Sequence, residues 1–150
     1  RRAAPSRTAR AKLPGRPALA YDGAMPEMLE PIIHTLASCD EVQVAWLYGS
    51  RARGDAGAAS DVDIAVAFRD RSADPWERVD ALRARLQASV GVPVSVIDIN
   101  RVPTPLAHNV IEQGRVLACR SDLRLRAEEN RIWSLWEEYR GTHERRRTTP

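Results

Sequence analysis

The sequence lacks long apolar runs and has few cysteines, and each shortage excludes a class of protein. No apolar stretch among its 150 residues approaches the roughly 18 residues needed to cross a membrane. No apolar stretch follows the basic N-terminus, so we expect no secretory signal. Two cysteines, Cys39 and Cys119, are too few for a disulfide scaffold. These features favour a cytoplasmic protein with reduced cysteines.

The rest of the composition is that of a folded domain. Hydrophobic residues make up 43% of the chain and charged residues 29%. This balance can bury a core, and it excludes a collagen-like or wholly disordered chain. A length of 150 residues suits a single domain.

Basic charge is concentrated at the N-terminus. The formal net charge is +3, but residues 1–17 hold six basic and no acidic residues, which leaves about −3 for residues 18–150. We expect residues 1–24 to be a disordered basic arm, residues 25–141 to be the folded domain and residues 142–150 to be a frayed tail. The arm is either a solvated tail or a contact for nucleic acid.

Residue periodicity predicts alternating helices and strands. Apolar residues at helical spacing predict helices, and runs rich in β-branched and aromatic residues predict strands. In chain order we expect a helix at 26–38, strands at 41–48 and 61–68, a helix at 75–91, a strand at 92–99, a helix at 104–114, a strand at 115–119 and a helix at 121–140. The segment between the first two strands is expected to be a loop of small residues. The order predicts an α/β (α+β) domain on a mixed sheet flanked by helices.

The last helix carries an unusual number of aromatic residues. Ile132, Leu135, Trp136 and Tyr139 fall on one face at helical spacing, and we expect that face to pack on the core. Trp133 lies off this face and is the better candidate for contact with a partner protein.

A turn suited to phosphate follows the first predicted strand. Gly49 lets the backbone approach a ligand closely, and backbone N–H groups at a turn or helix start can cradle phosphate oxygens. The hydroxyl of Ser50 adds a further donor. Arg51 and Arg53 lie just beyond and can pair with phosphate charge, although a solvated loop would also explain them.

Two aspartates begin the second predicted strand, ten residues after this turn. Asp61 and Asp63 alternate with Val62, so both carboxylates fall on one face of the strand, about 7 Å apart along the backbone. Mg²⁺ prefers oxygen ligands and commonly joins one or two carboxylates to substrate phosphates. A phosphate turn combined with paired aspartates therefore fits metal-assisted nucleotidyl transfer.

The segment GSRARGDAGAASDVDIAV at residues 49–66 resembles the signature of minimal nucleotidyltransferases in the DNA polymerase β superfamily. The resemblance runs from about Met28 to Tyr139, and VPVSVIDIN at 92–100 resembles the antitoxin branch of toxin–antitoxin systems with HEPN-class toxins. The resemblance implies a polymerase β-like fold and transfer of AMP from ATP to a tyrosine of a HEPN-class RNase toxin. That toxin would be silenced within a hetero-oligomer.

The resemblance also implies roles for particular residues. Gly49 and Ser50 would hold the ATP phosphates, and Asp61 and Asp63 would bind Mg²⁺. Family members carry a third carboxylate on the strand at 92–99. Here the first acidic position of that pattern is occupied by Ser95 and the second by Asp98.

Residues 95 and 98 point to opposite faces of a regular strand, so Asp98 can replace the missing carboxylate only if a bulge shifts the register. Either Asp98 is the third catalytic carboxylate, or the site has lost its base. The second possibility describes an antitoxin that acts by binding alone. A small-molecule nucleotidyltransferase of the antibiotic-modifying type is another alternative, although such enzymes usually carry an additional helical domain.

Overall fold

The computed structural model describes residues 27–54, 57, 60–71 and 74–148. The elements in chain order are α1 (Leu29–Ala37), β1 (Val42–Tyr48), α2 (Ser50–Arg53), β2 (Val62–Phe68), α3 (Pro75–Ser89), β3 (Val94–Asp98), α4 (Thr104–Gln113), β4 (Arg115–Cys119) and α5 (Asp122–Thr148). The expected alternation of helices and strands is confirmed, with α2 as an addition. The predicted basic arm lies outside the described residues.

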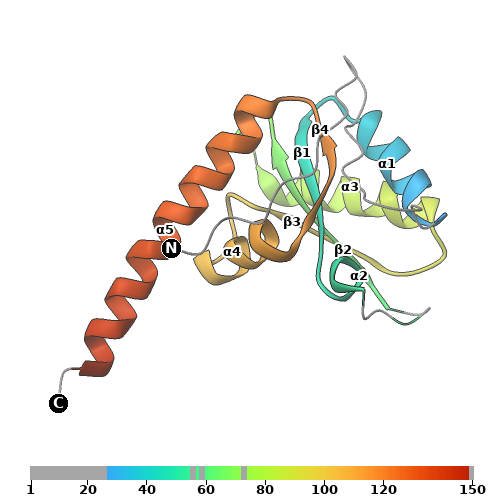
Figure 1. Ribbon diagram of the computed structural model, residues 1–150. Helices are drawn as coiled ribbons and strands as arrows, with labels where there is room; N and C mark the ends of the chain where they lie inside the picture. The colour runs from blue at the N-terminus through green and yellow to red at the C-terminus, as the bar shows by residue number, and fades with distance from the viewer. Residues whose placement is uncertain (1–26, 55–56, 58–59, 72–73, 149–150) are drawn as a thin grey trace.

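The four strands form one mixed sheet in the order β3-β2-β1-β4 (Figure 1). β1 is antiparallel to both β2 and β4, whereas β2 and β3 are parallel. The parallel pair requires a crossover connection, and α3 provides it. No helix in the described part of the chain is long and apolar enough to span a membrane.

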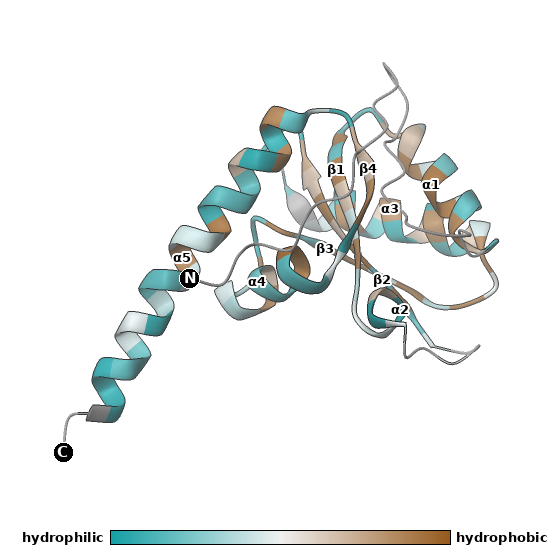
Figure 2. Cartoon of the chain, viewed as in Figure 1, coloured by the Kyte–Doolittle hydropathy of each residue, from teal (hydrophilic) through white to brown (hydrophobic). Residues whose placement is uncertain are grey.

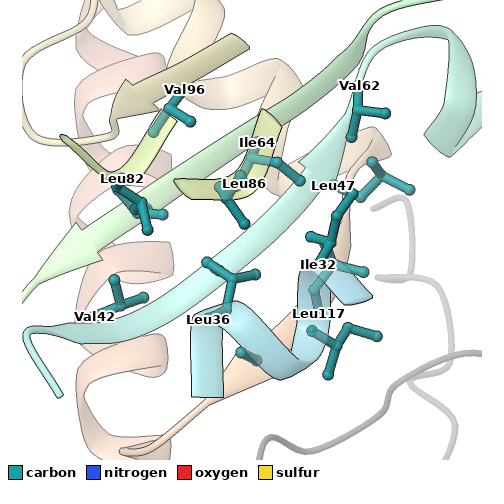
Figure 3. Close-up of a cluster of buried hydrophobic side chains, with 14 of the residues drawn as sticks. Ile32, Leu36, Val42, Leu47, Val62, Ile64, Leu82, Leu86, Val96 and Leu117 are labelled. Carbon is teal, nitrogen blue, oxygen red and sulfur yellow. The ribbon is translucent and has the colours of Figure 1, made fainter. Parts of the chain in front are cut away.

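Helices cover both faces of the sheet, and each face has its own core. Strand side chains alternate between the faces, so Ile64 and Val66 face α1 and α3, whereas Ala65 and Ala67 face α4 and α5. Figure 3 shows the first of these cores, in which Leu36 from α1 and Leu86 from α3 approach the strand side chains. In Figure 2 the strands are largely hydrophobic, whereas much of α5 is hydrophilic.

Local capping fixes the starts of two helices. Asp74 precedes α3, and its side chain accepts a hydrogen bond from the backbone N–H of Trp76 at 3.0 Å. The hydroxyl of Ser121 accepts one from the N–H of Arg124 at 3.1 Å, at the start of α5. Pro31 occupies the first turn of α1, where its missing N–H costs little.

The last helix is longer than expected. It was predicted to end near Arg140 with a frayed tail beyond, but it continues through Gly141 to Thr148. Arg140 lies 3.8 Å from both Glu137 and Glu144, and these pairs bridge the glycine along the helix surface.

The expectation that Leu135 packs in the core was wrong, because its side chain is 38% exposed. The residue lies about 80° around the helix from the middle of the face that Ile132 and Trp136 share, since each residue adds roughly 100°.

Candidate active site

The predicted phosphate turn is an abrupt junction between β1 and α2. Gly49 adopts a φ of +73°, a left-handed conformation that favours glycine. Its carbonyl oxygen accepts hydrogen bonds from the N–H groups of Ala52 and Arg53, at 3.1 and 3.2 Å. The chain therefore passes from the strand directly into a helical turn. Backbone N–H groups at such a start can bind phosphate oxygens.

The same glycine lies against the second predicted feature, the carboxylate of Asp63. A Cβ atom at Gly49 would overlap Oδ2 of Asp63 and lie 3.3 Å from its Cγ. Only a residue without a side chain allows this approach. The structure thus brings together the phosphate turn and one of the paired aspartates.

Asp63 is the middle member of a row of polar side chains across three strands. Tyr48 of β1 pairs with Asp63 of β2, and Asp63 pairs with Ser95 of β3. Residues paired across strands share a sheet face, here the face covered by α4 and α5. Asp61 is exposed and lies immediately before β2 begins at Val62.

The negative charge beside the polar row favours a bound cation. Burial raises the pKa of Asp63, the charge of Asp61 raises it further, and Arg53 opposes the shift. Among the described residues, no side chain or backbone donor forms a hydrogen bond or ion pair with the carboxylate of Asp61 or Asp63. The two carboxylates therefore offer oxygen ligands that no hydrogen-bond donor of the described residues occupies. Such a set of oxygen ligands fits Mg²⁺.

Within the part of the chain that the structure describes, this carboxylate pair has no third acidic or imidazole partner. Groups of three or more histidine, cysteine or acidic side chains that could hold a metal ion are absent from the described residues. The position beside Asp63 is occupied by Ser95, whose hydroxyl interacts with Tyr48. Burial raises the pKa of Tyr48, Asp63 raises it further, and the side chain of Ser95 opposes the shift.

Asp98, predicted as a third catalytic carboxylate, lies elsewhere. It pairs with Val66 at the far end of β3, and the β2–β3 ladder runs without a bulge from Ser95 to Asp98. Asp98 is therefore on the opposite face from Asp63 and about 10 Å further along the strand. It is 6% exposed, and its Oδ1 accepts a hydrogen bond from the N–H of Asn100 at 2.9 Å. The structure does not bring Asp98 to the paired aspartates.

The two candidate arginines occupy different positions. The Nε and Nη2 atoms of Arg51 donate to the carbonyl oxygen of Ser60, at 3.1 and 2.5 Å. Arg51 thereby fixes the chain immediately before Asp61. Arg53 is exposed and lowers the pKa of Asp63, so its charge acts on the site.

Three residues that the sequence analysis passed over also shape the site. Tyr48 belongs to the polar row, and its place at the end of a strand ahead of Gly49 was the available signal. Arg115 donates from Nε to the carbonyl oxygen of Ala52 at 3.2 Å, which ties β4 to α2. A Cβ atom at Gly114 would lie 2.9 Å from the carbonyl oxygen of Leu47, so a glycine lets the end of α4 approach β1.

Comparison with known proteins gives a consistent result. The family model described as polymerase beta, nucleotidyltransferase matches residues 30–123. A solved toxin–antitoxin structure with AMP-PNP contains a chain that is 23% identical, with a TM-score of 0.67 over 77% of this chain and 91% of that chain. A structure of a tri-AMPylated Shewanella oneidensis HEPN toxin in complex with MNT antitoxin gives a TM-score of 0.63 at 21% identity, over 78% of this chain and 90% of that chain. No curated protein matches.

Proposed function

The chain belongs to the polymerase beta nucleotidyltransferase family, and on that premise we propose that it is a cytoplasmic antitoxin that transfers AMP from ATP to a HEPN-class toxin. The observation that carries the proposal is the contact of Gly49 with Asp63, which joins a phosphate-binding turn to a carboxylate pair. The solved complexes with AMP-PNP and with an AMPylated toxin support the choice of nucleotide and partner.

In this proposal, separate groups of residues bind the nucleotide phosphates and the metal ion. The turn at Gly49 and the hydroxyl of Ser50 bind phosphate oxygens, and Arg53 adds positive charge. Asp61 and Asp63 would hold Mg²⁺, which supplies Lewis-acid stabilisation of phosphate charge when bound.

An acceptor hydroxyl attacks the α-phosphorus, so a new P–O bond forms while the α–β bridging bond breaks. Pyrophosphate leaves, and the backbone N–H groups of the turn stabilise the charge on its oxygens. The acceptor hydroxyl loses its proton to water, because residue 95 is a serine and supplies no carboxylate base.

One observation favours a second candidate function, an antitoxin that neutralises by binding alone. Ser95 lies beside Asp63, where a third carboxylate would have completed an acidic triad. General-base catalysis typically contributes about a hundredfold or more to a rate, so its loss could leave a slow transferase or an inactive one.

The two functions are separated by a transfer experiment on the intact pair. The chain is co-expressed with the protein encoded beside it, purified, and incubated with Mg²⁺ and ATP labelled at the α-phosphate. We expect label on the partner, loss of that label in Asp61→Asn, and its retention in the matched variant Asp98→Asn. A tight complex that silences the partner without label supports the binding-only antitoxin. Label only from the γ-phosphate contradicts AMP transfer, and the absence of both label and complex contradicts an antitoxin role.

A further inference from the structure

The backbone that carries Asp61 is held on both sides of this aspartate. On one side, the carbonyl oxygen of Ser60 accepts hydrogen bonds from Nε and Nη2 of Arg51, at 3.1 and 2.5 Å. On the other side, the N–H of Val62 donates to the carbonyl oxygen of Pro93 at 3.0 Å. These groups belong to the two planar peptide units that flank the Cα atom of Asp61. Bonding both units fixes the direction in which the side chain of Asp61 leaves the backbone.

Arg51 reaches Ser60 from a well-anchored position. It lies in α2 beside Ala52, which is 4% exposed and belongs to the core between the sheet, α1 and α3. The carbonyl oxygen of Ala52 accepts a hydrogen bond from Nε of Arg115 in β4 at 3.2 Å. The guanidinium of Arg51 is therefore carried by backbone that is itself fixed, and groups on rigid elements position their partners most precisely.

Asp61 needs such support because of its place in the chain. It is exposed and precedes the first residue of β2. The hydroxyl of Ser60 accepts a hydrogen bond from the N–H of Gly57 at 2.9 Å, but that bond joins near neighbours in the sequence. The bonds from Arg51 instead tie the segment to α2. A carboxylate that binds a metal ion has to be placed to within about 0.5 Å, so these bonds bear directly on metal affinity.

We propose that Arg51 is a positioning residue for the metal site, which holds Asp61 in place to bind Mg²⁺ and acts through that carboxylate instead of on the nucleotide. The inference rests on the proposed function in one respect, the assignment of Asp61 as a metal ligand. It separates Arg51 from Arg53, whose charge acts on Asp63.

The positive charge of Arg51 distinguishes positioning from a purely electrostatic effect. A guanidinium near a cation site repels the cation, so removing its charge would by electrostatics alone tighten metal binding. Losing the two bonds to Ser60 would weaken metal binding, because the ion would then have to order Asp61 as it binds. The direction of the change in metal affinity therefore tells the two effects apart.

The first test is a titration of the purified chain with Mn²⁺, followed by electron paramagnetic resonance without nucleotide. Mn²⁺ takes the same oxygen ligands as Mg²⁺. Arg51→Gln is compared with Arg53→Gln, which makes the same charge change two residues further along α2. We expect Arg51→Gln to raise the Kd for Mn²⁺ about tenfold and Arg53→Gln not to raise it. Arg51→Lys keeps the charge but replaces the two-donor edge with one ammonium group, and it should give an intermediate loss.

A control at the other end of the sheet separates positioning from general stability. Arg120 also donates to backbone, from Nε to the carbonyl oxygen of Val42 at 3.1 Å. Val42 begins β1, about 20 Å along the strand from Tyr48. We expect Arg51→Gln and Arg120→Gln both to lower the melting temperature, and only Arg51→Gln to weaken Mn²⁺ binding.

The second test asks whether Arg51 acts through Asp61. Adding Arg51→Gln to Asp61→Asn should cause no further loss of Mn²⁺ affinity, because the carboxylate that Arg51 positions is already absent. In transfer from α-labelled ATP, Arg51→Gln should raise the concentration of Mg²⁺ needed for half-maximal rate. The KM for ATP at saturating Mg²⁺ should stay that of the wild type.

The outcomes separate this inference from the proposed function. An unchanged or lower Kd for Mn²⁺ in Arg51→Gln overturns the positioning role, as does a further loss in the Asp61→Asn background. A higher KM for ATP with unchanged metal affinity would make Arg51 a phosphate-binding residue instead. Mn²⁺ binding that depends on Arg51 and Asp61 supports the positioning role even if no AMP is transferred. Transfer of label by a wild type that binds no Mn²⁺ would support the proposed function and contradict the positioning role.

Discussion

At the scale of single residues, the site depends on the close approach of Gly49 and Asp63. The glycine satisfies two separate demands, a positive φ and the absence of a Cβ atom beside the carboxylate. Asp63 in turn lies between the neutral hydroxyls of Tyr48 and Ser95. The charge of the site therefore comes from Asp61 and Asp63, opposed by Arg53.

Replacing Gly49 with alanine should damage both the fold and the site. Gly54→Ala is a matched control, because Gly54 has a φ of +82° but open space around it. Both variants carry backbone strain of about 1 kcal/mol or more, whereas Gly49→Ala also displaces Asp63. We expect a larger loss of unfolding free energy in urea for Gly49→Ala, together with a loss of Mg²⁺-dependent thermal stabilisation that Gly54→Ala retains. Equal losses of unfolding free energy in the two variants would show that the contact with Asp63 does not contribute to stability.

Replacing Asp63 with asparagine should stabilise the metal-free protein. Burial and Asp61 raise the pKa of Asp63, so its ionised form is disfavoured in the folded state at pH above that pKa. Asp63→Asn removes this penalty and should raise the melting temperature at neutral pH without Mg²⁺. Added Mg²⁺ should then stabilise the wild type and not the variant. AMP transfer should fall by about a hundredfold or more. A lower melting temperature for Asp63→Asn without metal would contradict this account.

At the scale of elements, α4 packs against α5 through a buried histidine. His108 is 5% exposed and stacks on Trp136, and its Nε2 has no hydrogen-bond partner among the described residues. Its Nδ1 lies 3.6 Å from Glu112. A neutral ring suits this buried stack better than a charged one, because ionisation would place a poorly solvated charge between the two helices.

The junction should make stability depend on pH. Burial lowers the pKa of His108 and Arg140 lowers it further, whereas Glu112 and Glu137 oppose the shift. The neutral ring contributes its full stabilisation of the fold above the unfolded-state pKa of about 6.5. This stabilisation is lost as the pH falls from about 6.5 through the lowered pKa of the folded state. We expect the urea midpoint to decrease between pH 7.5 and pH 5.5, and less so in His108→Phe. The exposed residue His34 provides the control, His34→Phe, which should keep the wild-type slope.

At the scale of the whole molecule, one buried carboxylate ties α5 to the rest of the fold. The oxygens of Glu128 accept from Arg71, Arg124 and Arg131 at 2.8 to 2.9 Å, and Arg71 is 57 residues away in sequence. Arg131 also donates to the carbonyl oxygen of Ile99, just past β3. The base of the projecting helix is thereby fixed against the β2–α3 connection and the end of β3.

Removing the charge of Glu128 should lower the free energy of unfolding. Burial alone would raise the pKa of Glu128, but Arg124 and Arg131 outweigh it and hold the pKa below its usual value. Glu128→Gln leaves these arginines without their carboxylate and should cost about 3 kcal/mol of unfolding free energy at pH 7, against little for the exposed control Glu138→Gln. Because the pKa is lowered, this stabilisation is present above the unfolded-state value and is lost as the pH falls through the folded value. The difference between the two variants should therefore shrink toward acid pH in guanidinium denaturation.

Local pattern in the sequence predicted most of the elements and the central site residues. Alternation placed Asp61 and Asp63 at the start of a strand, and the Gly49–Ser50 pair marked the turn before them. Pro75 and Ser121 stand at the starts of the helices expected at 75–91 and 121–140. These signals are readable because capping, alternation and turn formation involve residues within a few positions of one another.

Tertiary structure decided what depends on partners distant in sequence. The register of β3 on β2 put Ser95, not Asp98, beside Asp63, and no local pattern encodes which strand pairs with which. The packing of α5 on α4 decided that Leu135 stays exposed and that Trp136 stacks on His108. Sequence by itself determined the chemistry available to this protein. The tertiary structure decided which of those groups meet, because the pairing energies of strands and helices arise only once the chain has brought them together.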